Sequence, residues 1–553
     1  MNSDNTILQV QDLCIDAVDK YGKTISIVSN ISFSLDAGRV ISLIGASGSG
    51  KSTVSLATMG YTRPGCKIRK GKVMLQGEDL LSLDLSQIQS KRGSDIAYIA
   101  QSAAAAFNRA LTIGAQVTEV AVIKNLMTRQ QADQRAVSLY KQLGLPNPET
   151  IGKLYPHQVS GGQLQRLMAA MAMMCHPKLL ILDEPTTALD VTTQIEVLQA
   201  FKRLISEQNV AAIYVSHDLS VVAQMADDIL VLKDGRMVEL QSTQNILDNP
   251  EQKYTRMLMA AVPQLQLAKV SDKAPSTEAS DKHASDSDVK CRNELLKVSN
   301  ITASYGSNGI VVLKDVSLKV KMGETVGIIG ESGSGKTTLG RVISGLMSPS
   351  NGQVELLGRV LNNTYKQRSL DDLRQIQFVF QMAETALNPR HRIRQILGRP
   401  LEFYLGMTGK AAEARIIELL DLVELPANFI DRFPRELSGG QLQRINFARA
   451  LAAEPKLIIC DEITSALDTL VSKAIIELLI NLQKCLGVAY VFISHDLSTV
   501  AKLADSIAVM RHGEIVEFNS TEKVLKPPYH EYTELLLDSI PRLRTGWLEE
   551  VTV

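Results

Sequence analysis

The most constraining feature of this chain is that its notable motifs occur twice and in the same order. A glycine-rich segment recurs as GASGSGKS (45–52) and GESGSGKT (330–337), and the lysines Lys51 and Lys336 lie 285 residues apart. Three later motifs, SGGQ, an Asp-Glu pair and SHD, each recur at a separation of 278 residues. This period is far longer than that of a solenoid repeat, so the sequence predicts two homologous domains.

The two copies are separated by a segment of different composition. Residues 268–292 are rich in Ser, Asp, Lys and Ala and poor in large apolar side chains, which predicts a flexible linker. A flexible chain of about 25 residues has a root-mean-square span of roughly 27 Å, enough for two domains to face each other. We therefore predict a first domain over residues 1–267 and a second over residues 293–553, each with a C-terminal extension.

Apolar runs rich in β-forming residues predict a buried parallel sheet in each domain. RVISLIG (39–45), KLLILDE (178–184) and AAIYVSHD (211–218) are nearly continuous in hydrophobicity, as strands buried on both faces are. Helical stretches separate these runs, which predicts an α/β fold. The segments from Gln101 and Gln381 to SGGQ have a helical pattern and predict a helical subdomain beside each sheet.

Composition excludes several classes of protein. Lys+Arg and Asp+Glu are balanced at 59 each, so the basic excess expected of a nucleic-acid binder is missing. The six cysteines form no C-x-x-C pair, which favours reduced thiols over a metal site or disulfides. The N-terminus lacks the pattern of a signal peptide, and no apolar run approaches 18 residues. If the protein works at a membrane, we expect another chain to supply the crossing.

Both glycine-rich segments match the pattern G-x-x-x-x-G-K-[ST] in full. Each follows an apolar strand and precedes a helical pattern, which is the context of a phosphate-binding P-loop. Backbone N–H groups of such a loop surround the phosphates, the lysine reaches the β- and γ-phosphates, and the last hydroxyl holds Mg²⁺. The predicted nucleotide-binding residues of the two loops are Gly45, Ser47, Gly48, Gly50, Lys51, Ser52, Thr53, Gly330, Ser332, Gly333, Gly335, Lys336, Thr337 and Thr338.

Paired acids end an apolar strand in each half, in LLILDEP and LIICDEI. Such a pair is costly unless its charges meet a cation, so we expect Asp183 and Asp461 to orient Mg²⁺ through water. Glu184 and Glu462 are the candidates to activate the attacking water. Further strands end in VSHD and ISHD, whose histidines are candidates to sense or stabilise the γ-phosphate. The candidate catalytic residues are Glu184, Glu462, His217 and His495.

Together these motifs resemble the nucleotide-binding domain of ATP-binding-cassette proteins, over essentially both halves. SGGQ is the discriminating element, because other P-loop ATPases lack it. The resemblance implies head-to-tail pairing, in which each ATP lies between the P-loop of one half and the SGGQ of the other. The metal would be held by Ser52, Gln101 and Asp183 in site one and by Thr337, Gln381 and Asp461 in site two. Site one would be completed by Ser438, Gly439, Gly440 and Gln441, site two by Ser160, Gly161, Gly162 and Gln163, and the SALD-type loops would add Asp190 and Asp468.

The resemblance also implies an aromatic ring stacked on adenine, shortly before the P-loop. Tyr305 in ITASYG fits this position. Aligning Val10 with Val298 places Ala17 opposite Tyr305, so Tyr21 can serve the first half only if its loop is shifted. The other departures, VSGGQ for the commoner LSGGQ and an isoleucine after the second acid pair, keep the catalytic acids, and we expect two competent sites.

The segments that follow each core narrow the resemblance. DNPEQKYTRMLMAAVPQL (248–265) and KPPYHEYTELLLDSIPRL (526–543) resemble the extension of ATPases that energise the uptake of peptides, nickel and opine-type solutes. In the plainer interpretation they are closing amphipathic helices. The resemblance implies a peripheral ATPase on the cytoplasmic face of the inner membrane, with two permease subunits (or a dimeric permease) and an extracytoplasmic binding protein as partners.

A soluble tandem-cassette ATPase acting on ribosomes is the alternative. Such a translation factor would carry a long charged helical arm between its cassettes and usually a basic surface. Here the intervening segment is short and Ser/Asp-rich, and the net charge is zero, so we favour the importer. The sequence leaves the cargo open among peptides, nickel, metal chelates and opines.

Overall fold

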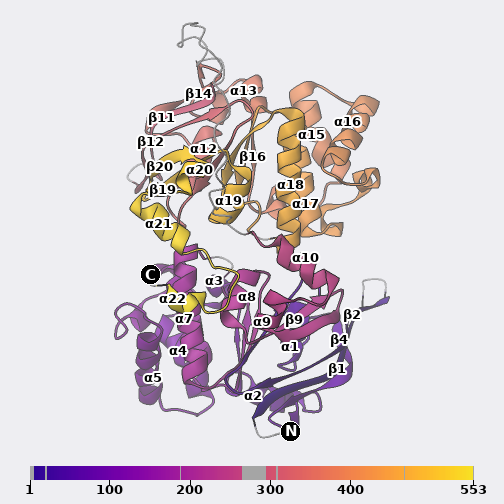
Figure 1. The fold of residues 1–553 in the computed structure, drawn as a ribbon, viewed down its shortest axis with the longest axis vertical. Helices are drawn as coiled ribbons and strands as arrows, with labels where there is room; N and C mark the ends of the chain where they lie inside the picture. The colour runs from indigo at the N-terminus through magenta and orange to yellow at the C-terminus, as the bar shows by residue number, and fades with distance from the viewer. Residues whose placement is uncertain are drawn as a thin grey trace. The chain divides into compact units, whose positions relative to one another are not determined.

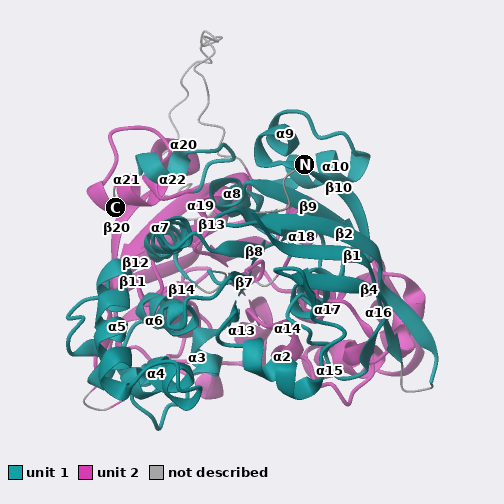
Figure 2. Ribbon diagram, turned by 90° about the horizontal axis from the view of Figure 1, so that it is seen from below, with its two compact units in different colours: residues 1–262, 468–470, 541–553 teal, residues 263–467, 471–540 magenta. Residues whose placement is uncertain are grey.

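The computed structural model describes residues 5–18, 22–186, 189–263, 294–306, 309–465 and 467–551. The predicted linker, 268–292, and Tyr21 lie outside the described residues. The chain divides into two compact units, one of residues 1–262, 468–470 and 541–553 and one of residues 263–467 and 471–540 (Figure 2). The domain boundaries expected from the sequence stay predictions, but two short segments that follow second-half residues in the chain pack with the first unit.

A six-stranded sheet forms the centre of the first unit, in the order β10-β9-β3-β8-β7-β6. The three predicted strands are present as β3 (Val40–Ile44), β7 (Leu179–Asp183) and β8 (Ala211–Val215). All three are buried along their whole length and pair in parallel, which explains their unbroken hydrophobicity. The sheet is completed by β6 (Ile96–Ile99), β9 (Asp228–Lys233) and the antiparallel edge strand β10 (Arg236–Ser242).

A second, antiparallel sheet covers the first core. Its order is β2-β1-β4-β5, with bounds β1 (Thr6–Val18), β2 (Thr24–Asp36), β4 (Cys66–Leu75) and β5 (Glu78–Asp79). Leu8 of β1 and Val28 of β2 share one buried cluster with Leu43 and Ile181 of the central sheet. This apolar layer fixes the strand that leads into the P-loop.

Most helices of the first unit pack, with residues of the central sheet, into a second apolar cluster, whereas the helix that follows the P-loop contributes Val54 and Ala57 to the first one. Those after Gln101 are α3 (Ala103–Ala106), α4 (Ile113–Ile123), α5 (Arg129–Gln142) and the 3₁₀ turns Ile151–Lys153 and Pro156–Gln158, so the predicted helical insert is present. The others are α1 (Lys51–Ala57), α2 (Leu85–Lys91), α6 (Gly161–Met173), α7 (Val191–Glu207), α8 (Leu219–Met225), α9 (Thr243–Asp248) and α10 (Lys253–Ala261). One further helix, α22 (Trp547–Glu550), comes from the last segment of the chain.

The second unit repeats this architecture (Figure 1). Its antiparallel sheet has the order β12-β11-β14-β15 and its central sheet the order β16-β17-β18-β13-β19-β20. The strands are β11 (Glu294–Ser304), β12 (Val311–Lys321), β13 (Thr325–Ile329), β14 (Asn351–Leu356), β15 (Arg359–Val360), β16 (Ile376–Val379), β17 (Leu457–Asp461), β18 (Ala489–Ile493), β19 (Ser506–Arg511) and β20 (Glu514–Ser520). The predicted α/β class with two tandem units is confirmed.

The helices of this half also follow the order of the first half. They are α12 (Lys336–Ile343), α13 (Leu370–Gln375), α14 (Ala383–Ala386), α15 (Ile393–Leu405), α16 (Gly409–Leu422), α17 (Gly439–Leu451), α18 (Thr469–Leu486), α19 (Leu497–Leu503), α20 (Thr521–Val524) and α21 (Glu531–Asp538). Short 3₁₀ turns cover Tyr365–Gln367, Ala427–Asp431 and Pro434–Glu436. Among the helices that the structure describes, none is both long and apolar enough to cross a bilayer.

Candidate functional site

Each P-loop joins a central strand to a helix, β3 to α1 in the first unit and β13 to α12 in the second. Glycine is required where the loop leaves the strand. A Cβ on Gly45 would lie 2.1 Å from the carbonyl oxygen of Leu232, and one on Gly330 would lie 2.1 Å from that of Met510. The loop backbone therefore sits directly on the neighbouring strand end, and its remaining N–H groups can face a ligand.

The P-loop lysines are held by the loops themselves. Lys51 Nζ donates to the carbonyl oxygens of Gly45 at 2.8 Å and Ala46 at 3.0 Å, and Lys336 Nζ makes the equivalent bonds at 2.7 Å each. Burial lowers the pKa of Lys51. Nearby carboxylates oppose this shift, and Glu184 has the largest effect among them. A buried ammonium group beside such a loop is suited to bind a phosphate, whose negative charge would compensate the positive charge of the lysine.

The predicted metal residues meet in hydroxyl–carboxylate pairs. Ser52 Oγ donates to Asp183 Oδ1 at 3.1 Å, and Thr337 Oγ1 donates to Asp461 Oδ1 at 2.9 Å. Burial raises the pKa of both aspartates, although these hydrogen bonds oppose the rise. A buried carboxylate beside a hydroxyl is a set of hard oxygen donors that a Mg²⁺ ion would fit and stabilise, so the residues present suit the metal.

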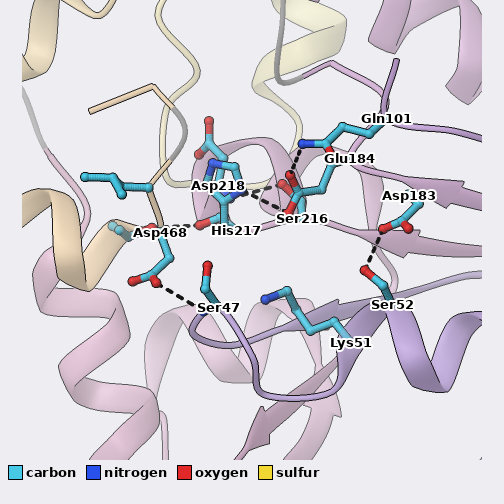
Figure 3. A network of polar contacts seen from close by, with 12 residues as sticks. Ser47, Lys51, Ser52, Gln101, Asp183, Glu184, Ser216, His217, Asp218 and Asp468 are labelled. Atoms are coloured by element: carbon cyan, nitrogen blue, oxygen red, sulfur yellow. Dashed lines mark hydrogen bonds and ion pairs between the residues drawn. The ribbon is translucent and has the colours of Figure 1, made fainter. Parts of the chain in front are cut away.

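Each candidate catalytic glutamate lies between an amide and an imidazole, and Figure 3 shows this for Glu184. Gln101 Nε2 donates to Glu184 Oε2 at 3.0 Å, and His217 Nδ1 lies 3.2 Å from Glu184 Oε1. In the second unit Gln381 Nε2 donates to Glu462 Oε2 at 2.9 Å, and His495 Nδ1 lies 3.7 Å from Oε1. The same arrangement of glutamine, glutamate and histidine is thus built twice.

Both glutamates occupy a strained backbone conformation. The φ angle is 50° at Glu184 and 48° at Glu462, in the left-handed region that non-glycine residues rarely adopt. Each is held there by its backbone N–H, which donates at 2.9 Å to the carbonyl of Val215 or Ile493. Strain of this kind, repeated at equivalent acids, is typical of functional positions.

The histidines and glutamates shift each other's pKa. Burial alone would lower the pKa of His217 and of His495, but the neighbouring carboxylate, Glu184 or Glu462, raises both. The nearby imidazole of His495 likewise lowers the pKa of Glu462. Glu462 is therefore ionised at neutral pH, which is the state a general base needs.

We expect His217 and His495 to titrate above the usual histidine pKa of about 6.5. A raised pKa in the folded state means that the protonated histidine adds stability below about pH 6.5, and that this stability is lost as the pH rises through the folded value. NMR of protein labelled with ¹³C in its eight histidines, assigned with His217→Asn and His495→Asn, measures the two pKa values.

The paired control uses the glutamates. Glu184→Gln should lower the pKa of His217 and leave that of His495, and Glu462→Gln should do the reverse. Two histidines that titrate at or below 6.5 in the unsubstituted protein contradict the expected coupling.

Asp468 lies at the first P-loop. The backbone N–H of Ser47 donates to Asp468 Oδ2 at 3.0 Å, and Thr469 Oγ1 donates to the carbonyl of His217 at 2.7 Å. Figure 3 shows Asp468 beside Ser47, and residues 468–470 belong to the first unit. Asp190 caps α7, since its Oδ1 accepts from the Thr193 N–H at 3.0 Å; its predicted role towards nucleotide stays a prediction.

Each SGGQ segment begins a helix, α6 or α17, through a capping box. Ser160 Oγ accepts from the Gln163 N–H at 3.3 Å, and Gln163 Oε1 accepts from the Ser160 N–H at 3.0 Å; Ser438 and Gln441 repeat both bonds. The two glycines of each segment differ. A Cβ on Gly162 would lie 2.1 Å from Thr193 Cγ2, whereas one on Gly161 would meet only Leu189 at 3.9 Å. Gly439 and Gly440 differ in the same way, so the first glycine of each pair leaves the helix start bare for an anion.

Sequence reasoning missed two tyrosines that hold the P-loops. The backbone N–H of Ala46 donates to Tyr254 Oη at 3.1 Å, and that of Glu331 donates to Tyr532 Oη at 3.0 Å. The next residue in each extension anchors its helix, because Thr255 donates to Glu239 at 2.5 Å. The signal was the Tyr-Thr pair that recurs in both extensions at the 278-residue separation.

Tyr254→Phe or Tyr532→Phe is expected to raise the ATP concentration for half-maximal turnover about three- to tenfold, because the loop N–H loses its acceptor at a cost of about 1 kcal/mol. Steady-state phosphate release at varied ATP measures it. Tyr61→Phe, at an exposed tyrosine whose ring lies against Arg92, is the control. Equal values for all three variants contradict the assigned role.

Two further aromatic residues distinguish the sites. Tyr98 Oη donates to Asp183 Oδ2 at 2.9 Å, whereas Phe378 stands at the equivalent place in β16, so Asp461 lacks this bond. Tyr305, the predicted adenine-stacking residue, is about half exposed at 49%, and its hydroxyl lies 3.2 Å from Thr338 Oγ1. It thus lies beside the P-loop helix α12, and stacking on adenine stays a prediction.

Comparison with known families decides the classification. The sequence profile of the family described as "ABC transporter" matches residues 28–187 and 313–465, more than half of the chain. The chain belongs to the ABC transporter family. A second profile, "Oligopeptide/dipeptide transporter, C-terminal region", matches residues 238–292 and 516–552, which include both Tyr-Thr extensions.

The chain is similar to ATP-binding subunits of transporters. The Glutathione import ATP-binding proteins GsiA of Escherichia coli (strain K12) and Shigella sonnei (strain Ss046) are each 38% identical over 559 residues, which cover 97% of this chain and 89% of the relative. Among solved structures, a dimeric ATP-binding cassette with ADP and Pi is 34% identical, with a TM-score of 0.38 over 41% of this chain and 99% of that one. The cbiO1 subunit of Clostridium perfringens is 27% identical, with a TM-score of 0.39 over 42% and 90%.

Membership makes this chain an ATP-hydrolysing protein that works in transport. The predicted ABC transporter ATPase is thereby confirmed. The matches support the importer ATPase and do not support the translation factor.

Proposed function

We propose that this chain energises the import of a peptide-type solute through two composite ATP sites. The observation that carries the proposal is the duplicated constellation, in which Glu184 and Glu462 each keep a glutamine, a histidine and a buried P-loop lysine. A degraded site would have lost one of these parts. Two intact copies favour turnover at both.

In each site the chain's own residues divide the work. Ser52, Gln101 and Asp183 would hold Mg²⁺ in site one, and Thr337, Gln381 and Asp461 would hold it in site two. The bound metal would neutralise negative charge on the phosphates of ATP. Glu184 and Glu462 accept the proton of the attacking water at a carboxylate oxygen. The glutamine amide and the histidine, one on each oxygen, fix the direction of that carboxylate. The P-loop lysine binds phosphate in place of the two carbonyls it now contacts.

We assign Ser160, Gly161, Gly162 and Gln163 to the nucleotide held by Lys336, and Ser438, Gly439, Gly440 and Gln441 to the one held by Lys51. The position of Asp468 at the Ser47 N–H supports this head-to-tail pairing, because that aspartate follows the second half's catalytic acid in sequence. Asp190 would take the equivalent place at the second P-loop. ATP then acts as a bridge between two helix N-termini.

We assign the helical subdomains to the permease. Exposed apolar side chains lie on both sides of Gln381, since Phe380 is 39% and Met382 is 53% exposed. Ile123 in α4 of the first unit is 69% exposed. Apolar surface of this kind suits a cytoplasmic helix from each of two permease subunits, and Gln381 would pass the nucleotide state to it. The chain would thus act at the inner face of the cell membrane.

The cargo that we favour is a small peptide. Its support is the match to the oligopeptide/dipeptide C-terminal region and the glutathione-import name of the relatives, since glutathione is a tripeptide. Nickel, metal chelates and opines are the other solutes of such transporters and are outcomes of the same test.

Co-purification with the membrane partners and the binding protein tests the proposal. The assembled complex is placed in vesicles, and uptake is measured for glutathione, other tripeptides, nickel chelates and an opine. We expect ATP-dependent uptake of a peptide and stimulation of ATP turnover by the loaded binding protein. Uptake of a chelate or opine alone overturns the peptide assignment, and recovery of the chain with ribosomes overturns the importer.

A further inference from the structure

The C-terminal segment of the chain is part of the first unit. Residues 471–540 belong to the second unit, and residues 541–553 belong to the first (Figure 2). Trp547 and Leu548 of α22 are only 2% and 1% exposed and lie in the main apolar cluster of the first unit. Leu543 and Val551 pack against the same cluster. The segment is therefore anchored by two buried side chains, with a partly buried apolar side chain on either side of them.

Two glutamines of the first unit bind the main chain of this segment. Gln224 of α8 is 1% exposed. Its Nε2 donates to the carbonyls of Arg542 at 2.8 Å and Arg544 at 2.7 Å, and its Oε1 accepts from the Leu548 N–H at 3.1 Å. A buried amide with three such partners has its hydrogen-bonding capacity nearly filled by one peptide segment.

Gln199 of α7 completes the contact from a second helix. Its Nε2 donates to the carbonyls of Leu548 and Val551 at 3.0 Å each. Lys202, one turn further along α7, pairs with Glu549 at 2.5 Å. Figure 1 shows α22 beside α7. Helices α7 and α8 thus bind the segment through hydrogen bonds to its main chain and an ion pair, in addition to its apolar anchor.

The internal repeat provides a natural comparison, because the second half lacks this surface. At the 278-residue separation Glu477 stands opposite Gln199, and Lys502 stands opposite Gln224. Both charged residues are exposed, whereas Gln224 is buried under the segment. Two homologous surfaces have therefore diverged, and only the first carries amides where the C-terminal segment lies.

We propose that residues 541–551 are a clasp that ties the second nucleotide-binding domain to the α7–α8 surface of the first. The covalent connection at 540–541 makes the clasp a second link between the domains, in addition to the chain between residues 263 and 294. A second link raises the effective concentration of one domain for the other. The clasp thus keeps the domains ready to pair when the bridging ATP has been hydrolysed.

Trp547 is the only tryptophan of the chain, so its fluorescence reports the clasp directly. We compare the full-length protein with Gln199→Ala and with Gln199→Ala/Gln224→Ala, and use Glu477→Ala/Lys502→Ala as the matched control in the second half. The clasp predicts a red-shifted emission and about two- to fivefold stronger acrylamide quenching in the glutamine variants, and no change in the control. Emission that is unchanged in both glutamine variants overturns the docking.

A chain that ends at Ile540 supplies an independent test. A fluorescent peptide of residues 541–553 should bind this truncated protein, measured by anisotropy. It should fail to bind when the truncated protein also carries Gln199→Ala and Gln224→Ala. A peptide with Trp547→Ala and Leu548→Ala is the control. Equal binding of both peptides, or no binding of either, overturns the proposed surface.

The tethering role has its own readout, which rests on the proposed pairing of ATP sites. Truncation at Ile540 should raise the ATP concentration for half-maximal turnover about three- to tenfold by loss of effective concentration, with the maximal rate within about twofold. Trp547 fluorescence does not depend on ATP turnover, so failure of the clasp and failure of the ATP assignment are distinguishable. A glutamine variant that releases Trp547 but keeps its ATP dependence overturns the tether.

Discussion

Replacing Glu184 and Glu462 together with glutamine should lower ATP turnover by about 100-fold or more, the usual contribution of a general base. Glutamine keeps the shape of the side chain and can still meet Gln101 or Gln381, but it cannot accept the proton of water. Nucleotide binding should survive, because the P-loop lysines and the Ser52–Asp183 and Thr337–Asp461 pairs are untouched. Phosphate release measures turnover, and retained ³²P-ATP after rapid gel filtration measures binding.

The single variants decide whether both sites are needed. Glu184→Gln and Glu462→Gln should each lower turnover, because each glutamate accepts from its glutamine, at 3.0 Å and 2.9 Å, and each lies beside a histidine. Glu196→Gln, at an acid of α7 that is 46% exposed and paired with Arg166, is the matched control and should leave turnover unchanged. Undiminished turnover in the double variant contradicts the assignment of both glutamates.

The strands and the P-loops could be predicted because their sequence signals are local. A continuous apolar run can be satisfied only by burial on both faces, so β3, β7 and β8 followed from the sequence. Glycine at position 45 is dictated by a carbonyl 2.1 Å from its missing Cβ, and the P-loop pattern records that requirement. The paired acids were likewise visible, since charges at the end of a buried strand need a cation.

Contacts to the main chain left no such signal. Gln199 and Gln224 bind carbonyl and N–H groups of residues 542–551, and main-chain atoms are the same whatever the sequence. The sequence alone therefore predicts this segment as part of the second domain, residues 293–553. Tyr254 and Tyr532 were hidden for the same reason, because each accepts from a backbone N–H of the P-loop.

The strained glutamates show a third case. Nothing in LLILDEP or LIICDEI states that the second acid adopts a φ near 50°. The strain follows from the N–H of each glutamate, which bonds to the neighbouring strand β8 or β18 and so turns the chain as the strand ends. Its recurrence at equivalent residues shows that both halves keep the same turn where the strand ends.

A carboxylate introduced at Gly161 should damage the ATP site of the opposite half. Gly161→Asp is chosen because a Cβ there meets only Leu189 at 3.9 Å, and an acid in the first turn of α6 favours the helix by about 0.3–1 kcal/mol. The helix therefore stays folded, and the new charge faces whatever anion the SGGQ segment binds. Repulsion from a phosphate should weaken nucleotide binding at least tenfold, which corresponds to about 1.4 kcal/mol.

The test requires that only one site bind ATP. In a Glu184→Gln/Glu462→Gln protein, which retains ATP without hydrolysing it, Lys51→Ala leaves the site of Lys336 as the only one loaded. Adding Gly161→Asp should then abolish retention, while adding Gly439→Asp, where a Cβ meets only Leu467 at 3.7 Å, should spare it. With Lys336→Ala in place of Lys51→Ala the two aspartates should exchange effects.

The opposite pattern in both backgrounds would show that each SGGQ serves the P-loop of its own half and would end the head-to-tail assignment. The exchange is the decisive feature, because a general loss of folding would remove retention in both backgrounds alike.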